Sequence, residues 1–236
     1  MPDVFNISKI LLKKNHSQHV FLKGWKNRAN RLNTLVKEQN ISPQLLTDTV
    51  HDLDTTQTIL INLLETTSVT RTDIKKMIDY QKEYKPDTNP RYWAVFKIAE
   101  HSKNKRLYVF DRLDQKVQAY YATHGKNSDP DNDGLATEFS NEVNSLKSSI
   151  GLYRTWETYT MNKHGTALRL DGLEHTNSRA RERGIVFHGV PYAGDAYVKI
   201  HDKCGRSHGC PAVDYSVSQM LIKQLKGGSL LLITNQ

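Results

Sequence analysis

Cysteine is scarce in this chain, at two residues in 236, and long apolar runs are missing. No stretch approaches the roughly 18 consecutive apolar residues that a membrane-spanning helix needs. An apolar cluster near the N-terminus, Ile10-Leu11-Leu12, is too short for the centre of a signal peptide. We therefore expect a soluble protein without a membrane span.

Acidic residues are fewer than basic ones: the chain has 25 aspartates and glutamates and 33 lysines and arginines, which give a formal net charge of +8. A positive balance favours anionic partners such as nucleic acid, acidic lipid or a cell-wall polymer. The basic residues are scattered along the chain, with no long block and no nucleic-acid-binding motif around them. The charge therefore indicates a solvated basic surface, and we expect no nucleic-acid partner.

Glycine is almost absent from the first third of the chain, where apolar residues recur at helical spacing. Thr70 with Asp73 forms a capping box that opens a helix carrying Ile74 and Met77. The prolines that follow break any helix, and the pattern then changes. We expect a small helical N-terminal region of unknown role over residues 1–85 and a second domain over residues 86–236.

Short runs typical of β-strands make up most of the second domain, and turn-forming residues separate them. The expected strands are residues 92–98, 107–110, 117–122, 150–153, 167–170, 185–188 and 230–234. One late helix, over about residues 216–225, ends before Gly227-Gly228. The expected fold class is α+β, a mostly β domain preceded by the helical region.

The segment around Cys210 has the residue types of a thiol nucleophile. An imidazole can take the proton of a cysteine, and His208 and the upstream pair His188-Gly189 both offer one. Backbone N–H groups beside Gly209 suit an oxyanion, because glycine has no side chain to block its approach. The sequence therefore predicts a nucleophile at Cys210, although a structural histidine at position 188 would look the same in isolation.

A metal or a disulfide would use the same segment differently. Four residues of the types that bind zinc lie within ten positions: His201, Cys204, His208 and Cys210. The single residue between the last two does not match the usual spacers of structural zinc sites. A disulfide between Cys204 and Cys210 is conceivable across so short a loop, but it would remove the thiol. We expect no metal and no cofactor, and the disulfide stays open.

An acidic loop between the expected strands resembles the opening of a calcium site. It runs from Asp129 to Gly134 and alternates acids before a glycine. The last position of such a loop needs a bidentate glutamate, but Ser140 stands there and Glu138 comes two places early. The sequence favours a plain polar loop over a calcium site.

The pair His188-Gly189 followed by Ser207-His208-Gly209-Cys210 resembles the signature of the L,D-transpeptidases of the bacterial cell wall, the YkuD-like family. Further segments resemble the murein L,D-transpeptidase catalytic domain branch: Gly151-Leu152-Tyr153, Glu157-Thr158-Tyr159, Lys163-His164-Gly165, Leu168 to Glu174, and Arg206 to Val213. The resemblance covers about residues 89–233 and leaves the N-terminal third uncovered. It implies an L,D-transpeptidase-like catalytic domain that acts on peptidoglycan stem peptides.

The resemblance also implies roles for these residues. Cys210 would attack the carbonyl of the L-centre of a diamino acid, expel the terminal D-alanine and carry a thioester. His188 would be the general base, oriented by a backbone carbonyl rather than by an acid. The N–H groups of Gly209 and Cys210 would form the oxyanion hole, and His208 would support the site.

One position departs from the family pattern. Most members place arginine or asparagine two residues after the cysteine, where this chain has Ala212. Arg206 is the alternative partner for a substrate carboxylate, since a guanidinium matches a carboxylate well. The expected substrate-binding set is Arg206, Ser207, Gly189 and Tyr192.

Three functions fit this set of residues. The first is cysteine-dependent acyl transfer between stem peptides, to which the net positive charge is suited. The second is a peptidoglycan hydrolase, either an L,D-carboxypeptidase or a crosslink-cutting enzyme. The third is an exported wall-targeting effector whose helical N-terminal region binds a protein partner. All three predict a place in the periplasm or cell envelope, reached through a signal that was removed or by another export route.

Overall fold

The computed structural model describes residues 67–84, 91–114, 116–162 and 165–236. The helical pattern expected before residue 67 lies outside the described residues. The proposed domain boundary at residues 85 and 86 also remains a prediction.

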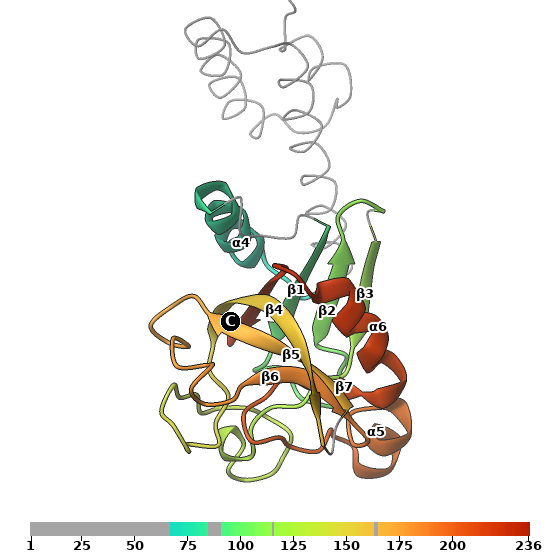
Figure 1. Ribbon diagram of the computed structural model, residues 1–236. Helices are drawn as coiled ribbons and strands as arrows, with labels where there is room; N and C mark the ends of the chain where they lie inside the picture. The colour runs from blue at the N-terminus through green and yellow to red at the C-terminus, as the bar shows by residue number, and fades with distance from the viewer. Residues whose placement is uncertain (1–66, 85–90, 115, 163–164) are drawn as a thin grey trace, which may run out of the picture. The chain divides into compact units, whose positions relative to one another are not determined.

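Eight strands form one mixed sheet in the order β3-β2-β1-β8-β4-β5-β6-β7 (Figure 1). They are β1 (Tyr92–Lys97), β2 (Leu107–Asp111), β3 (Lys116–Tyr120), β4 (Gly151–Met161), β5 (Gly165–Gly172), β6 (Val186–Val190), β7 (Ala212–Asp214) and β8 (Leu230–Thr234). Neighbouring strands are antiparallel except for the parallel pairs β1–β8 and β6–β7. All seven expected strands are present, and the α+β, mostly β class is confirmed.

The central strands are buried on both faces, which explains their continuous apolar sequence. In β1, Trp93 and Val95 enter one apolar cluster, whereas Ala94 and Phe96 enter the other. In β8, Leu230 and Leu232 face the first cluster, and Leu231 and Ile233 face the second. Since side chains alternate between the faces of a strand, each of these strands stabilises two layers of core.

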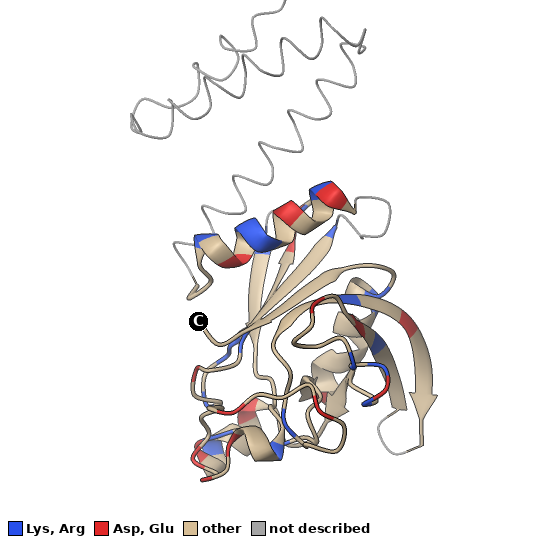
Figure 2. Cartoon of the chain, turned by 90° about the vertical axis from the view of Figure 1, so that its left-hand side faces the viewer, with Lys and Arg blue, Asp and Glu red and all other residues tan. Residues whose placement is uncertain are grey.

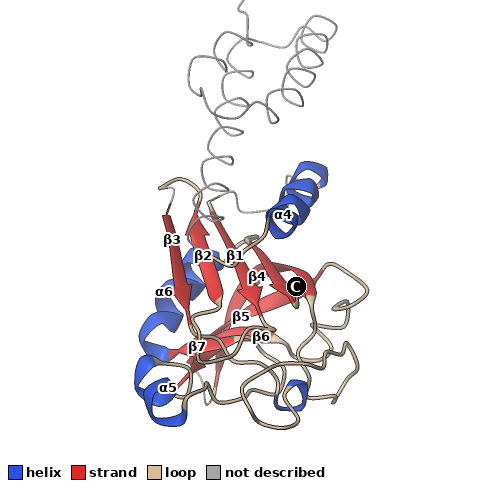
Figure 3. Cartoon of the chain, turned by 180° about the vertical axis from the view of Figure 1, so that it is seen from behind, coloured by secondary structure: helices blue, strands red, loops and turns tan. Residues whose placement is uncertain are grey.

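Among the described residues, three α-helices accompany the sheet, α4 (Arg71–Glu83), α5 (Asp195–His201) and α6 (Tyr215–Leu225), together with a short 3₁₀ helix, η2 (Lys126–Ser128). Figures 1 and 3 show α4 and α6 on different sides of the strands. The expected helix over 216–225 is α6, and Asp214 caps its N-terminus by accepting from the Ser216 N–H at 2.9 Å. Among the described segments, no helix has both the length and the apolar character required to cross a membrane.

Helix α4 begins at the predicted capping box. The Thr70 hydroxyl accepts from the Asp73 N–H at 3.2 Å, and the Asp73 carboxylate accepts from the Thr70 N–H at 2.8 Å. The apolar side chains of Ile74 and Met77 pack into the cluster formed by β1, β2 and β8. Charged residues are conspicuous on this helix, whereas the strands carry few (Figure 2). Helix α4 thus covers one face of the sheet with its apolar side.

A buried ion pair joins α4 to β1. The Lys97 ammonium lies 3.0 Å from the Asp73 carboxylate, and the two side chains are only 4% and 3% exposed. A buried charge that loses its partner is strongly destabilising. Asp73 therefore serves twice, as helix cap and as the counter-ion of a buried lysine.

Replacing Asp73 by alanine is expected to lower the free energy of unfolding by about 3–5 kcal/mol, because Lys97 loses its buried partner. Urea denaturation followed by circular dichroism measures this loss. The matched control is Asp79→Ala on the same helix, where Asp79 pairs with Lys75 on the exposed face. Exposed pairs contribute about 0–1 kcal/mol. Equal losses in the two variants would contradict the role of the buried pair.

Candidate active site

The two sequence segments predicted to form the site meet at one edge of the sheet. His188 lies in β6, and its parallel partner in β7 is Ala212. Cys210 precedes Ala212 by two residues, at the entrance to β7. Strand pairing therefore brings together residues that are 22 positions apart in the sequence.

The Cys210 thiol lies between a backbone acceptor and a backbone donor. Its Sγ is 3.8 Å from the Gly184 carbonyl oxygen, to which the S–H donates, and accepts from the Val186 N–H at 3.5 Å. Burial raises the pKa of the Cys210 thiol, while the Val186 N–H and the Arg183 charge act in the opposite direction. The resting thiol is therefore protonated at neutral pH and needs a base to become a nucleophile.

His188 is the residue predicted to act as that base. The imidazole is buried in β6, and its Nδ1 lies 3.1 Å from the Gly189 carbonyl oxygen. A proton on Nδ1 donates to that carbonyl, which leaves Nε2 as the acceptor. The partner of the ring at this nitrogen is a backbone carbonyl, as the family resemblance implies.

Gly189 is buried under α6 rather than open to solvent. A Cβ at this position would lie 2.6 Å from the Tyr215 ring and 2.7 Å from the Ser218 hydroxyl. Both residues belong to α6. The glycine therefore allows α6 to pack closely on β6 behind His188, and its carbonyl holds the imidazole.

Ser207 organises the nucleophile loop, residues 204–210. Its buried Oγ lies 2.7 Å from the Cys210 carbonyl oxygen and accepts from the Gly209 N–H at 3.1 Å. The Gly209 N–H is thus engaged inside the loop. Within the described residues, the N–H groups of His208 and Cys210 donate no hydrogen bond.

Only glycine fits at position 209. Its φ is +119°, in a region that L side chains rarely adopt. A Cβ there would also lie 2.7 Å from the Lys147 carbonyl oxygen. Gly209 therefore lets the loop turn tightly against residues 140–149 and present the Cys210 backbone.

Comparison with known proteins shows the family of this chain. The L,D-transpeptidase catalytic domain family matches residues 64–234, well over half of the chain. The chain belongs to this family. No curated protein matches the sequence.

Solved structures with a similar fold include a Bdellovibrio bacteriovorus protein, Bd1075, at 20% identity and a TM-score of 0.39, covering 64% of this chain and 50% of that one. An L,D-transpeptidase from Mycobacterium smegmatis is 12% identical with a TM-score of 0.37, covering 61% and 58%. One from Stackebrandtia nassauensis is 14% identical with a TM-score of 0.36, covering 61% and 55%. The match thus spans only half to three fifths of these chains, and the family assignment rests on the match over residues 64–234.

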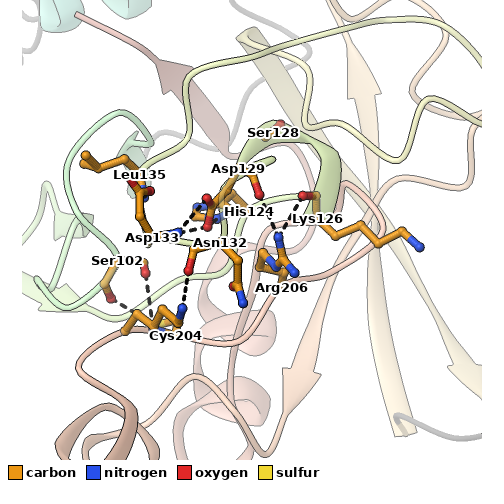
Figure 4. Close-up of polar contacts among 12 residues, drawn as sticks. Ser102, His124, Lys126, Ser128, Asp129, Asn132, Asp133, Leu135, Cys204 and Arg206 are labelled. Atoms are coloured by element: carbon orange, nitrogen blue, oxygen red, sulfur yellow. Dashed lines mark hydrogen bonds and ion pairs between the residues drawn. The ribbon is translucent and has the colours of Figure 1, made fainter.

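The other predicted site residues of this L,D-transpeptidase family member surround the loop. The His208 side chain is exposed beside Cys210. Tyr192 is half-buried, and burial together with the nearby Cys210 raises its pKa. One terminal nitrogen of Arg206 donates to the carbonyls of Asp129 at 2.6 Å and Lys126 at 3.2 Å (Figure 4). Arg206 therefore ties the nucleophile loop to η2 with part of its guanidinium.

Arg183 was not predicted to lie near Cys210, because the sequence shows it only as one of several scattered basic residues. It donates to the Ser140 carbonyl at 2.7 Å and to the Ser149 hydroxyl at 2.9 Å, and its charge favours the Cys210 thiolate. Ser148 was also missed, and its hydroxyl donates to the Gly209 carbonyl at 3.2 Å. Neither residue has a local sequence signal, because both act on a segment distant in the chain.

The metal and disulfide alternatives concern Cys204 as well. Both cysteines are free thiols. Cys204 is buried, its S–H donates to the Ser102 carbonyl at 3.1 Å, and burial raises its pKa to about 11. In the part of the chain that the structure describes, no three His, Cys, Asp or Glu side chains are grouped to hold a metal ion.

The acidic loop that resembled a calcium site is organised by its own backbone. Both carboxylate oxygens of Asp129 accept hydrogen bonds, from the Asp133 N–H at 3.0 Å and the Gly134 N–H at 3.1 Å. The Asp133 carboxylate accepts from the Leu135 N–H at 2.8 Å. These carboxylates therefore shape the loop.

Iodoacetamide is expected to label Cys210 in the native protein and to leave Cys204 unlabelled, because only Cys210 is partly exposed. The rate should rise with pH well beyond neutrality, since the raised pKa keeps the thiol protonated at pH 7. Mass spectrometry of labelled peptides measures both effects. Cys204→Ala should leave the rate unchanged, whereas comparable labelling of both cysteines would contradict this picture.

Proposed function

We propose that this protein is a cysteine L,D-transpeptidase that transfers acyl groups between peptidoglycan stem peptides in the cell envelope. The observation that supports the proposal is the β6–β7 pairing, in which His188 lies opposite Ala212, two residues after Cys210. Membership of the L,D-transpeptidase catalytic domain family supplies the reaction class. The residues themselves suggest how each step proceeds.

In the first step, His188 Nε2 takes the proton from Cys210, and Sγ attacks the carbonyl carbon at the L-centre of the donor stem. The Val186 N–H and the Arg183 charge stabilise the thiolate as it forms. The tetrahedral intermediate then collapses, and the bond to the terminal D-alanine breaks. His188 returns its proton to the departing amine, so the products are a thioester and free D-alanine.

The intermediate needs donors for its oxyanion. The Cys210 N–H has no partner within the described residues, whereas the Gly209 N–H donates to Ser207. We therefore assign the main oxyanion contact to the Cys210 N–H, and Gly209 supplies the open approach. A donor fixed before the reaction is worth far more than a mobile one, because it needs no reorganisation.

Donor-stem binding falls to the side chains around the loop. Arg206 uses one terminal nitrogen on η2, and the rest of its guanidinium makes no hydrogen bond in the described part of the chain. We assign that free edge to a substrate carboxylate, in place of the residue that Ala212 does not provide. Tyr192 and His208 line the approach, while Ser207 and Gly189 support it from behind.

In the second step an acceptor takes the acyl group. An amine of a second stem, deprotonated by His188, attacks the thioester, forms the crosslink and releases the thiol. The second candidate is hydrolysis, in which water is the acceptor and the same residues act. The partial exposure of Cys210 allows water to reach the thioester. A protein partner for the N-terminal region stays a prediction.

Purified disaccharide-tetrapeptides incubated with the full chain should give crosslinked dimers and free D-alanine, detected by mass spectrometry. Cys210→Ala should abolish both products, and His188→Gln should lower the rate by about 10²–10⁴, the usual contribution of a general base. Cys204→Ala is the matched thiol control and should retain activity.

The products decide between the two candidates. Dimers indicate transpeptidation, whereas D-alanine release with shortened monomers indicates hydrolysis. A chain that leaves the stems unchanged, or a Cys210→Ala variant as active as the parent, would overturn the proposal.

A further inference from the structure

A chain of buried polar side chains lies behind the nucleophile loop, and the reaction above does not use it. Arg106 donates from a terminal nitrogen to His124 Nδ1 at 2.8 Å, and His124 Nε2 lies 3.2 Å from the Asp129 carboxylate. All three side chains are at most 1% exposed. Figure 4 shows His124 beside Asp129, in the same group of polar contacts as Arg206.

The partners fix the protonation of His124. A guanidinium only donates, so Nδ1 must accept and the proton must sit on Nε2, from which it donates to Asp129. Burial and the Arg106 charge lower the His124 pKa to about 4, so the ring is neutral at physiological pH. Both ring nitrogens are therefore bonded in a single tautomer, and the side chain has one orientation.

The backbone of His124 holds Ser207. Its carbonyl accepts from the Ser207 N–H at 2.8 Å, and the next two residues continue the contact. Gly125 forms a bridge with Ser207, and the Lys126 N–H donates to the Ser207 carbonyl at 2.8 Å. Orientation of the His124 side chain thus fixes the strip of backbone on which Ser207 lies.

Ser207 passes this constraint to the nucleophile. Its hydroxyl is bonded to the Gly209 N–H and the Cys210 carbonyl, as described above. Thr123, the residue before His124, also holds this end of the loop, because its N–H donates to the Ala212 carbonyl at 2.9 Å. The residues on both sides of Cys210 therefore rest on the segment that carries His124.

We propose that His124, clamped between Arg106 and Asp129, is a positioning residue that acts through Ser207 to hold Cys210 and its N–H in the reactive geometry. Buried charged side chains such as Arg106 and Asp129 are weak evidence for a gain in stability, since apolar residues often replace such groups without loss of stability. Their effect on the position of the nucleophile is different, because a misplacement of about 1 Å can lower the reaction rate by a factor of about 10². The catalytic part of this inference rests on the proposed function.

The test is a double-mutant cycle between His124→Gln and Ser207→Ala in the full chain. His124→Gln is expected to lower kcat for stem-peptide transfer by about 10–100-fold and to change KM less, because Arg206 keeps its hydrogen bonds to the Lys126 and Asp129 carbonyls. If His124 acts through Ser207, the double variant loses no more than the worse single variant.

Alkylation of Cys210 by iodoacetamide provides a readout that needs no peptidoglycan. Burial raises the Cys210 pKa, so a loosened loop should let it fall towards the ordinary value of about 8.5. His124→Gln should therefore react faster at pH 7, by about tenfold for each unit of pKa. Transfer slows while alkylation speeds up, a combination that simple loss of folded protein does not produce under native conditions.

Asp73→Asn is the matched control, since it disturbs a buried ion pair far from the loop in sequence. It should lower the melting temperature and leave kcat and the alkylation profile unchanged. If His124→Gln does not fold, Asp129→Asn, which retains the ring and backbone of His124, takes its place in the cycle.

Additive losses in the cycle, or a lower melting temperature with an unchanged alkylation profile, would overturn the positioning role. If the parent protein does not act on stem peptides, the proposed function fails, and the double-mutant cycle is then evaluated from the alkylation rates of Cys210 alone. The two failures are therefore distinguishable.

Discussion

The parallel pairing of β6 with β7 is the contact on which the site depends. It joins a fully buried strand to a strand of only three residues, and it pairs His188 with Ala212, two residues after Cys210. Neither segment alone contains both the predicted base and the predicted nucleophile. β6 is fixed by β5 and by α6 packed against Gly189, so the base lies on a rigid element. The nucleophile is fixed by loop contacts instead.

Those loop contacts are mostly backbone groups and small hydroxyls. Ser207, Ser148 and Thr123 each link the nucleophile loop to a segment distant in the chain. Short side chains lose little rotamer entropy on being ordered, and each hydroxyl both donates and accepts. A protein can therefore fix a strained glycine turn with modest interactions, provided that several converge on it.

Two opposing effects act on the ionisation of the Cys210 thiol. Burial disfavours the thiolate, and the Val186 N–H with the Arg183 charge partly offsets this effect. The resting thiol therefore stays protonated, and the thiolate forms only when a base removes the proton. Two buried cations elsewhere are compensated in different ways. Lys97 pairs with the Asp73 carboxylate, whereas Arg106 donates to backbone carbonyls and to the neutral His124 ring.

Much of the fold followed from local patterns. Continuous apolar runs predicted the strands of the central sheet, the Thr70 capping box predicted α4, and the glycine pair after residue 226 predicted the end of α6. β7 was missed because three residues show no periodicity. α5 was missed because its seven residues begin without a side-chain cap. Short elements are held by tertiary contacts, which leave no local signal.

The chemistry-bearing residues were determined by the sequence itself, because a cysteine among glycines and histidines is a local motif. The tertiary structure decided what surrounds them. It buried Ser207 and Gly189 as supports, turned part of Arg206 towards η2, and brought Arg183 to the thiol. His124-Gly125 repeats the His-Gly pair seen at 188, yet only the fold shows that its ring is locked between Arg106 and Asp129. Residue type sets which reactions are available, whereas burial and hydrogen-bond partners, which depend on distant segments, decide which group performs them.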